Sequence, residues 1–348
     1  MPSSRPQRRE ATTMSTDGEG PVKRRHHVVP NFYLRRFADE KRMITRVPLG
    51  GGEVRTIPTK DATVQTDFYR LEHPELRPDA LEDALAGIEA DIAPALTRVV
   101  DQGAWPPSDE DRFWLATFVA LQYLRSQSTR SGIEEITRSI GKLELGVMST
   151  DQVREMLGLS DDASDAQVEE LRANALVTAD TFAVDRHAHL RYLLDGLEGT
   201  TNLVMGRGPW ALILWERKVL GTSDSPVICV SDETTGFYSN AGFGMARELI
   251  VPVGRRACLV LGKVGGEGED QRLAGNSARA RLINDYTLRN ARREAFHHPD
   301  DQPFAGREVP KRRDREIQVS GSHIDTLIRD FARMQGRPSG LPGEESSE

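Results

Sequence analysis

The spacing of apolar residues changes along this chain, and that change limits the fold class more than any other feature. Between residues 81 and 99, apolar side chains recur three and four positions apart, as on one face of a helix. From Gly208 onward, short runs rich in β-branched residues are separated by turn residues, which is typical of strands joined by hairpins: 210–215, 219–222, 226–230, 248–252 and 257–262. Because helices and strands occupy separate stretches, we predict an α+β fold with a C-terminal antiparallel sheet.

The remaining elements follow from the same patterns. Pro30 begins a short N-terminal helix that ends near Ala38, and the alternating runs 43–47 and 53–57 form a β-hairpin, with a candidate third strand over 64–71. In the middle of the chain we predict helices at 81–99, 108–124, 132–145, 151–157 and 165–198. Ser108 is the N-cap of the second of these helices. A helix over 271–294 is predicted to pack on the C-terminal sheet.

We expect one domain within the 348 residues, at residues 24–300. Residues 1–22 and 337–348 are poor in apolar residues, which predicts a disordered leader and a disordered tail. Residues 301–336 are predicted to form a basic linker and an amphipathic helix near 323–335.

Composition excludes several classes of protein. No apolar run approaches the roughly 20 residues of a membrane helix, and no apolar segment follows the N-terminal arginines, so we expect a cytoplasmic protein without a membrane partner. The two cysteines, Cys229 and Cys258, lie in strand-like runs, which excludes a disulfide framework and a cysteine-rich zinc site. The net charge of −7 argues against a protein that binds nucleic acid over its whole surface.

Residues 26–37 read His-His-Val-Val-Pro-Asn-Phe-Tyr-Leu-Arg-Arg-Phe. This block resembles, at every signature position, the His-His-x-Val-Pro-x-Phe-Tyr-Leu-Arg-x-Phe motif of an uncharacterised bacterial family, a domain of unknown function. The resemblance continues in order to about residue 300, through Asp67–Tyr69, the helix with Glu82 and Glu89, Phe118–Arg125, Thr222–Pro226 and Asn284–Arg293. Where the family has a Pro-Leu-Ser-Pro turn, this chain has Pro252-Val-Gly-Arg255. The resemblance implies one α+β domain and no particular activity.

His26 and His27 are the first candidates for chemistry, because imidazole moves protons near neutral pH and binds metal ions. Adjacent residues point in different directions, which argues against one metal ion held by both rings. The structural alternative is an N-terminal anchor in which one ring bonds to the backbone. The block also resembles the start of an HNH nuclease motif, but the match is weak because the nearest downstream histidine, His73, lies in a His-Pro turn.

Ser223 and Asp224 lie between two predicted strands, just before Pro226. One interpretation is a turn closed by side-chain to backbone hydrogen bonds, and the other is a carboxylate that binds a metal ion or orients a histidine. As catalytic residues and metal ligands we predict His26, His27 and Asp224. As substrate-binding residues we predict Tyr33, Arg36, Gln122, Arg125, Ser223 and Asn284.

A polar seam is predicted between two helices of the middle segment. Glu82 and Glu89 lie on roughly the same helix face, and Gln122 and Arg125 lie on one face of the next helix. If the two helices pair antiparallel, Arg125 meets a glutamate. The result is either a buried salt bridge or an anion site, for which the planar guanidinium is suited.

Weaker candidates are His187 with His189, the loop 297–301, and the basic stretch 289–315, and each has a structural or solvated interpretation. The chain lacks the sequence motifs of dinucleotide enzymes, P-loop ATPases, α/β-hydrolases and zincin proteases.

Two functions remain open. The first is a metal-dependent hydrolase that acts on a phosphate-containing substrate, with nucleic acid as one candidate, in which a divalent metal ion is held by a histidine of the block and Asp224, and Arg125 holds an anion. It requires residues about 200 positions apart to meet in one pocket. The second is a non-catalytic binding or regulatory module. It predicts a histidine ring bonded to backbone and an Asp224 that caps a turn.

Overall fold

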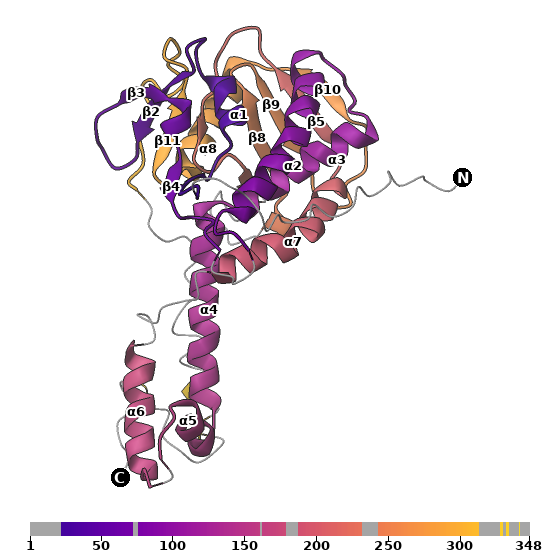
Figure 1. Cartoon of the computed structure of the whole chain (residues 1–348). Coiled ribbons are helices and arrows are strands. Elements are labelled where there is room, and N and C mark those ends of the chain that lie inside the picture. Colours follow the sequence, from indigo (N-terminus) through magenta and orange to yellow (C-terminus); the bar gives the residue numbers. More distant parts are fainter. Residues whose placement is uncertain are drawn as a thin grey trace. The chain divides into compact units, whose positions relative to one another are not determined.

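The computed structural model describes residues 22–71, 76–160, 162–178, 187–231, 243–312, 328–329, 332–333 and 341. The chain divides into two compact units (Figure 1). The first consists of Met1–Thr129 and Leu190–Asp314, and the second of Arg130–His189 and Arg315–Glu348. The predicted leader apart from Val22, most of the predicted C-terminal helix and most of the predicted tail lie outside the described residues.

The N-terminal block begins with a strand rather than a loop. Strand β1 (Arg25–His27) pairs antiparallel with β4 (Val64–Thr66), so that His26 lies opposite Gln65. The predicted short helix is present as α1 (Asn31–Leu34) and a 3-10 turn (Arg35–Phe37). The predicted hairpin is also confirmed, as β2 (Met43–Pro48) paired with β3 (Arg55–Pro58). The run at 64–71 therefore adds a strand to the block and not to the hairpin.

A four-stranded sheet joins the N-terminal hairpin to the distant part of the chain, in the order β3-β2-β11-β6. Strand β11 (Glu294–His297) lies between β2 and the two-residue strand β6 (Thr222–Ser223), and pairs antiparallel with both. One of the five predicted C-terminal strands thus leaves its sequence neighbours and pairs with the N-terminal sheet.

The other four predicted strands, together with β10, form a five-stranded sheet in the order β10-β5-β9-β8-β7. Its members are β5 (Trp210–Leu214), β7 (Ile228–Val230), β8 (Glu248–Gly254), β9 (Ala257–Leu261) and β10 (Gln271–Ala274). All neighbours are antiparallel except β10 and β5, which are parallel. The C-terminal sheet is confirmed, with one parallel edge.

The helix predicted over 271–294 is shorter than expected. Helix α8 is Ser277–Asn290, and the side chain of Asn276 caps it by accepting a hydrogen bond of 2.8 Å from the backbone N–H of Arg279. The flanking residues pair with other strands, as β10 and β11. The residues at both ends of the predicted helix are therefore strands, because they pair with strands that are distant in the sequence.

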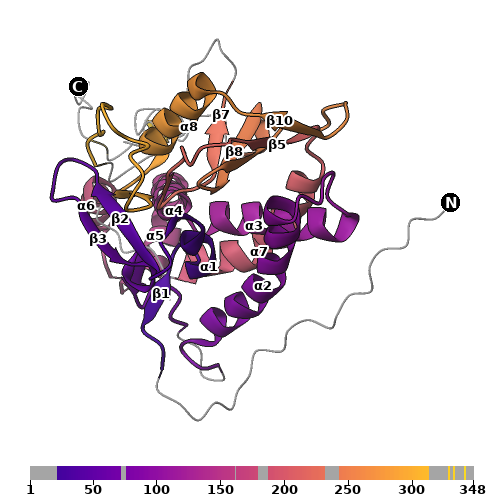
Figure 2. The same cartoon turned by 90° about the horizontal axis from the view of Figure 1, so that it is seen from above.

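Helices α2 (Ala80–Leu96) and α3 (Asp109–Leu124) form a helical layer on one face of the five-stranded sheet (Figure 2). Helix α2 continues into a π-helical turn, Thr97–Asp101. The predicted N-cap of α3 is confirmed, because the Ser108 hydroxyl accepts from the backbone N–H of Asp111 at 3.1 Å. The cap satisfies one of the free N–H groups that begin every helix.

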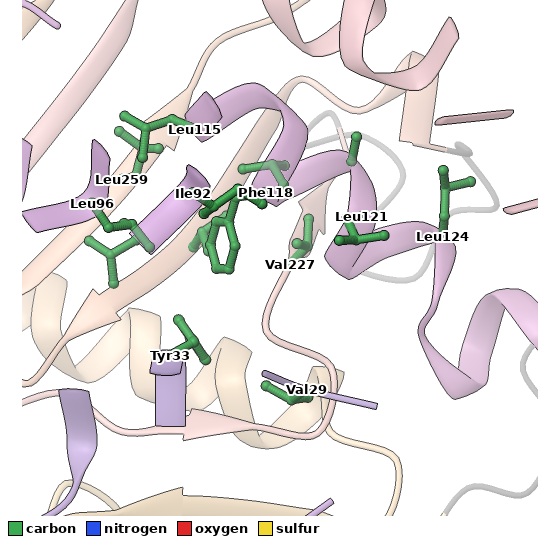
Figure 3. Close-up of a cluster of buried hydrophobic side chains, with 14 of the residues drawn as sticks. Val29, Tyr33, Ile92, Leu96, Leu115, Phe118, Leu121, Leu124, Val227 and Leu259 are labelled. Atoms are coloured by element: carbon green, nitrogen blue, oxygen red, sulfur yellow. The ribbon is translucent and has the colours of Figure 1, made fainter. Parts of the chain in front are cut away.

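Apolar packing explains why both faces of the five-stranded sheet are covered. Successive strand residues point to opposite faces, so Leu259 and Leu261 join the core with α2 and α3, whereas Cys258 and Val260 pack with Ile283 of α8. Figure 3 shows the larger core, in which side chains of α2 and α3 meet Leu259 and residues of the N-terminal block. Tyr33 of the block is fully buried there.

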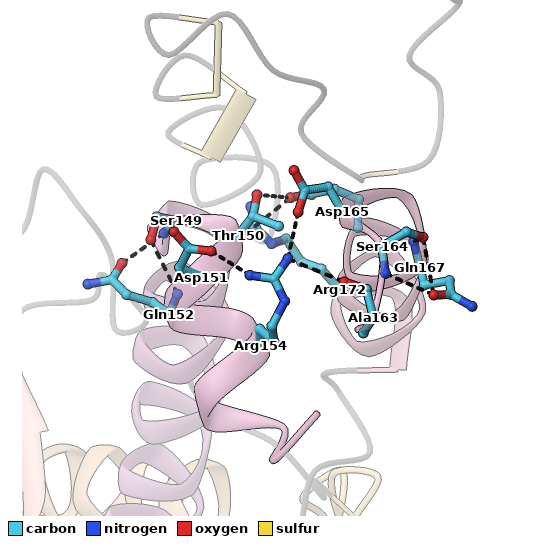
Figure 4. A network of polar contacts seen from close by, with 11 residues as sticks. Ser149, Thr150, Asp151, Gln152, Arg154, Ala163, Ser164, Asp165, Gln167 and Arg172 are labelled. Atoms are coloured by element: carbon cyan, nitrogen blue, oxygen red, sulfur yellow. Dashed lines mark hydrogen bonds and ion pairs between the residues drawn. The ribbon is translucent and has the colours of Figure 1, made fainter. Parts of the chain in front are cut away.

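The second unit is helical where it is described. It contains α4 (Gln127–Val147) from Arg130 on, α5 (Thr150–Met156), α6 (Asp165–Thr178), and the first residues of α7 (His187–Met205). Arg154 bridges Asp151 and Asp165 in a polar network at the helix ends (Figure 4). A small apolar core of its own includes Leu145, Val153 and Val168. Across the described part of the chain, no helix combines the length and apolar character needed to cross a membrane.

Candidate functional site

His26 is fully buried, and both of its ring nitrogens bond to backbone groups. Nδ1 accepts a hydrogen bond from the backbone N–H of Tyr69 at 2.7 Å. Nε2 therefore carries a proton, which it donates to the Lys23 carbonyl at 3.0 Å. The ring also stacks on Tyr69, with centroids 5.6 Å apart. In this arrangement His26 ties β1 to Tyr69 and holds that residue in place.

His27 has different neighbours, as expected for adjacent strand residues. Its ring is half-buried, and within the described residues no hydrogen bond of ordinary geometry reaches Nδ1. Burial lowers the pKa of His27, while the Ala62 carbonyl and the Glu89 carboxylate oppose this and Arg125 adds to it. The ring is neutral at pH 7, close to a carboxylate of α2 and a guanidinium of α3.

Asp224 is partly buried, and its carboxylate accepts hydrogen bonds from backbone groups just before and at the start of β11. Its carboxylate accepts from the N–H groups of Arg292 at 2.8 Å, Arg293 at 2.8 Å and Glu294 at 3.3 Å. Burial raises the pKa of Asp224 to about 6, and these N–H groups oppose the rise. The neighbouring Ser223 hydroxyl closes a turn with the backbone of Ser225, at 3.0 and 3.2 Å. Both side chains are arranged as the turn interpretation expects.

The N-terminal block and the 222–225 segment do lie together, through a contact that spacing did not indicate. The Tyr33 hydroxyl donates to the Pro252 carbonyl at 2.6 Å, and the Thr222 hydroxyl lies 2.7 Å from it. Burial raises the pKa of Tyr33. The carboxylate of Asp224 is engaged with β11, so the contact between the two segments is made by Tyr33 and Thr222.

Two other predicted substrate-binding residues make internal bonds. Arg36 forms a two-point ion pair with Asp101, at 2.7 and 2.9 Å, and donates to a backbone carbonyl of β8. Asn284 of α8 is buried, accepts from the Gly221 N–H at 3.2 Å and donates to the Val219 carbonyl at 2.8 Å. These contacts connect sheets and helices of the first unit.

The predicted seam between α2 and α3 is present. Arg125 is 1% exposed and donates to Glu89 at 2.7 Å. With its amide oxygen facing the guanidinium, Gln122 accepts from Nη2 and Nε of Arg125 at 2.6 and 3.1 Å. The salt-bridge interpretation therefore describes Arg125, whose described partners already engage all three of its nitrogen atoms.

Glu82 lies on helix α2, as Glu89 does, but its environment differs from that of Glu89. Its half-buried carboxyl has no hydrogen-bond or ion-pair partner among the described residues. Burial raises the pKa of Glu82 to about 7, and the charge of Glu89 raises it further, while Arg125 and Lys23 oppose the rise. At neutral pH this carboxyl is close to half protonated.

Tyr69 lies among these groups and was not predicted as a site residue. Its hydroxyl is fully buried and has the guanidinium of Arg125 as its polar neighbour, at a geometry short of an ordinary hydrogen bond. Burial raises the pKa of Tyr69, with Arg125 opposing the rise and Glu82 and Glu89 adding to it. No spacing in the sequence indicated Tyr69, because it reaches the helices only through the strand that His26 holds.

These residues form the Arg125 cluster, which consists of His27, Tyr69, Glu82, Glu89, Gln122 and Arg125. It combines a neutral imidazole, a carboxyl with a raised pKa and a buried hydroxyl, which are groups suited to proton transfer or to polar ligand binding. Within the described residues, no three His, Cys, Asp or Glu side chains are grouped so that they could hold a metal ion.

The weaker candidates also have structural surroundings. His297 and His298 are buried, and their ring nitrogens lie 2.8 Å from the His298 carbonyl and 3.1 Å from the Asp300 N–H respectively. Burial lowers the pKa of both rings. Nearby, Arg255 and Asp301 form a two-point ion pair. The side chain of His187 lies outside the described residues.

Comparisons with known proteins agree with the resemblance seen in the sequence. A protein-family model described as a protein of unknown function, DUF4238, matches residues 25–301. That range contains the N-terminal block, both larger sheets and the Arg125 cluster. No curated protein matches the chain. No solved structure matches it either.

Proposed function

Because the chain belongs to the DUF4238 family of proteins of unknown function, we propose a role from its own geometry: a non-catalytic binding or regulatory module of the cytoplasm. The observation that supports this most is the engagement of both His26 nitrogens by backbone groups. The three backbone bonds of Asp224 support it as well. In this proposal the block is a clasp, and ligand recognition belongs to the Arg125 cluster.

The experiment compares purified wild type with His26→Ala, His27→Ala and Asp91→Asn. Asp91 is an exposed carboxylate of α2 and serves as the matched control. Divalent-metal content and melting temperature are measured for each protein. A binding module predicts a large fall in melting temperature for His26→Ala, a small fall for His27→Ala, and no metal lost in either. Stoichiometric metal that is lost in a His27→Ala variant of normal melting temperature would contradict the proposal.

A second candidate is the hydrolase that acts on a phosphate-containing substrate. The specific observation that favours it is a carboxyl with a pKa of about 7, Glu82, in one cluster with the neutral ring of His27. A general acid and a general base both work best with pKa values near the working pH. In this candidate the neutral His27 ring takes a proton from the water that attacks phosphorus, and the protonated carboxyl of Glu82 gives a proton to the leaving oxygen as its bond to phosphorus breaks. Catalytic and metal-binding roles for His26 and Asp224 stay predictions.

Phosphodiester hydrolysis tests this candidate. Wild type, Glu82→Gln and Asp91→Asn are incubated with bis(p-nitrophenyl) phosphate and with single-stranded DNA and RNA, with and without Mg²⁺ or Mn²⁺. Turnover that is abolished in Glu82→Gln and kept in Asp91→Asn would establish the hydrolase and refute the non-catalytic module. Equal background rates in all three proteins would refute the hydrolase.

The extent of the functional domain is part of the proposal. We infer that residues 24–300 act together, between a leader at 1–22, a basic linker and helix at 301–336, and a tail at 337–348. The family match over residues 25–301 supports this extent. Limited trypsin digestion is expected to leave a fragment that ends beyond residue 300, whereas early cleavage within 130–189 would argue against one domain.

A further inference from the structure

An apolar stripe runs along helix α4, and the second unit covers it only in part. The α4 stripe consists of residues spaced alternately three and four positions apart: Ile133, Ile136, Ile140, Leu143 and Val147. At its centre Ile136 is 44% exposed and Ile140 is 52% exposed. This spacing is the heptad pattern of helices that pair along an apolar seam, and apolar surface that stays exposed along such a seam marks a protein contact.

The core of the second unit limits the exposed part of the stripe. Leu143 packs against that core. Gly146 is covered as well, because a Cβ there would lie 2.7 Å from the side chain of Ile328. The part that a partner can reach is therefore the region around Ile136 and Ile140, which precedes these contacts along the helix.

The charges beside the stripe select a second copy of the chain as the partner. With the heptad positions lettered a to g, Ile133 and Ile140 occupy position a, which puts Arg130 and Glu144 at position e, on one edge of the seam. When two identical helices pair antiparallel over the whole stripe, Ile136 packs against Ile140 of the second copy. Edge e then faces edge e, so Arg130 meets Glu144 of the second copy, and two-fold symmetry makes this ion pair twice.

A parallel pair lacks this complementarity. Edge e would then face edge g, which places Glu144 opposite the uncharged Ser139 of the second copy. Arg130 already pairs with Glu134 of its own helix at 3.1 Å. In the antiparallel arrangement, Glu144 of the second copy extends that pair into a network of opposite charges.

We propose that helix α4 is a dimerisation surface, at which two copies of this chain pair antiparallel through the α4 stripe. The two-fold axis passes beside Thr137, an exposed residue at position e that faces its own counterpart. The surface belongs to the second unit, whereas the Arg125 cluster belongs to the first. Dimerisation is therefore independent of the proposed function.

The test is sedimentation velocity of the full-length protein from about 5 to 500 µM. The exposed seam is short, so we expect a reversible dimer with a dissociation constant of about 10 to 100 µM. Ile136→Glu and Ile140→Glu should each raise that constant at least about tenfold at an unchanged melting temperature, because each change enters the dimer twice. Leu282→Glu on α8 is the matched control, since Leu282 is 46% exposed, and should leave dimerisation unchanged.

Crosslinking and charge reversal test the direction of the pair. A short bismaleimide should join two copies of Thr137→Cys, whereas Lys142→Cys, at an outward heptad position, should give no more crosslinking than wild type. Glu144→Arg should weaken the dimer several-fold, because two arginines then meet, and adding Arg130→Glu should restore it.

Three results would overturn the proposal. A protein that stays monomeric over the whole concentration range would leave the stripe to a different protein. A dimer that is equally strong in wild type, Ile136→Glu and Ile140→Glu would use another surface. Crosslinking through Lys142→Cys in place of Thr137→Cys would contradict the antiparallel seam.

Discussion

The guanidinium of Arg125 and the carboxylate of Glu89 lie 2.7 Å apart, although Arg125 is almost fully buried. This pair joins helix α3 to helix α2 beside the N-terminal block. The pair also makes two glutamates on one helix face different: Glu89 forms an ion pair with Arg125, whereas Glu82 forms no ion pair with the described residues. The properties of the cluster follow from that difference.

Removing the cation should destabilise the fold strongly. Arg125→Met leaves the Glu89 carboxylate partly buried without its partner, which typically costs about 3 to 5 kcal/mol. Adding Glu89→Gln to the same protein should recover a large part of that loss, because no unpaired charge remains. Urea unfolding of both single variants and the double variant measures this coupling. Strictly additive losses would show that the two side chains do not interact.

The role of His26 as a clasp has a direct consequence for stability. His26→Ala removes two backbone bonds and leaves the buried Tyr69 N–H without an acceptor, so we expect a loss of about 2 kcal/mol or more. His27→Ala is the matched control and should lose less, because its ring is only half-buried. Unfolding midpoints in urea decide the order. A His26→Ala protein as stable as wild type would refute the clasp.

Asp224 should matter for the start of β11. Asp224→Ala strands three backbone N–H groups, for an expected loss on the order of 3 kcal/mol. Asp300 provides the control, since its side chain is 87% exposed and Asp300→Ala should change stability by less than about 0.5 kcal/mol. Thermal unfolding of the two variants at one pH gives the comparison, and equal losses would count against the cap.

Glu82 should make stability depend on pH. Its folded pKa of about 7 lies above the ordinary value of 4.5, so its protonated form favours the native state. This contribution is complete below about pH 4.5 and is lost as pH rises through 7. Glu82→Gln cannot titrate, so relative to wild type it should gain roughly 1 to 2 kcal/mol between pH 4.5 and 8 after solvent screening. Urea unfolding across that range measures the difference, and a constant difference would contradict it.

Two glycines of α4 should respond in opposite directions to alanine. A Cβ at Gly146 would lie 2.7 Å from the buried side chain of Ile328, so Gly146→Ala is expected to cost about 1 to 3 kcal/mol. A Cβ at Gly141 meets nothing within 4 Å, so Gly141→Ala should stabilise by roughly 0.5 to 1 kcal/mol. Chemical unfolding of the two variants tests both signs. A stabilising Gly146→Ala would mean that Ile328 does not pack there.

Local pattern determined much of this protein. The apolar period predicted the α+β class, the hairpin and helix α3 with its Ser108 cap, because these depend on residues close in sequence. The family resemblance depended on the N-terminal block and on the order of the segments that follow it, and a family model matches residues 25–301. Helix spacing also indicated that Arg125 would meet a glutamate, since side chains three, four or seven apart share a helix face.

Only the tertiary structure decided which partners the site residues take. The backbone N–H of Tyr69 donates to His26, which lies 43 positions away in the sequence. Strand β6 pairs with β11 and not with the strands next to it in the sequence. Both ends of the predicted 271–294 helix became strands for the same reason. The spacing of apolar residues indicates which face of a helix or strand is buried. It does not indicate which distant backbone groups form hydrogen bonds with that helix or strand. The environments of His26, Asp224 and Glu82 depend on that second choice, so they became readable only in the folded chain.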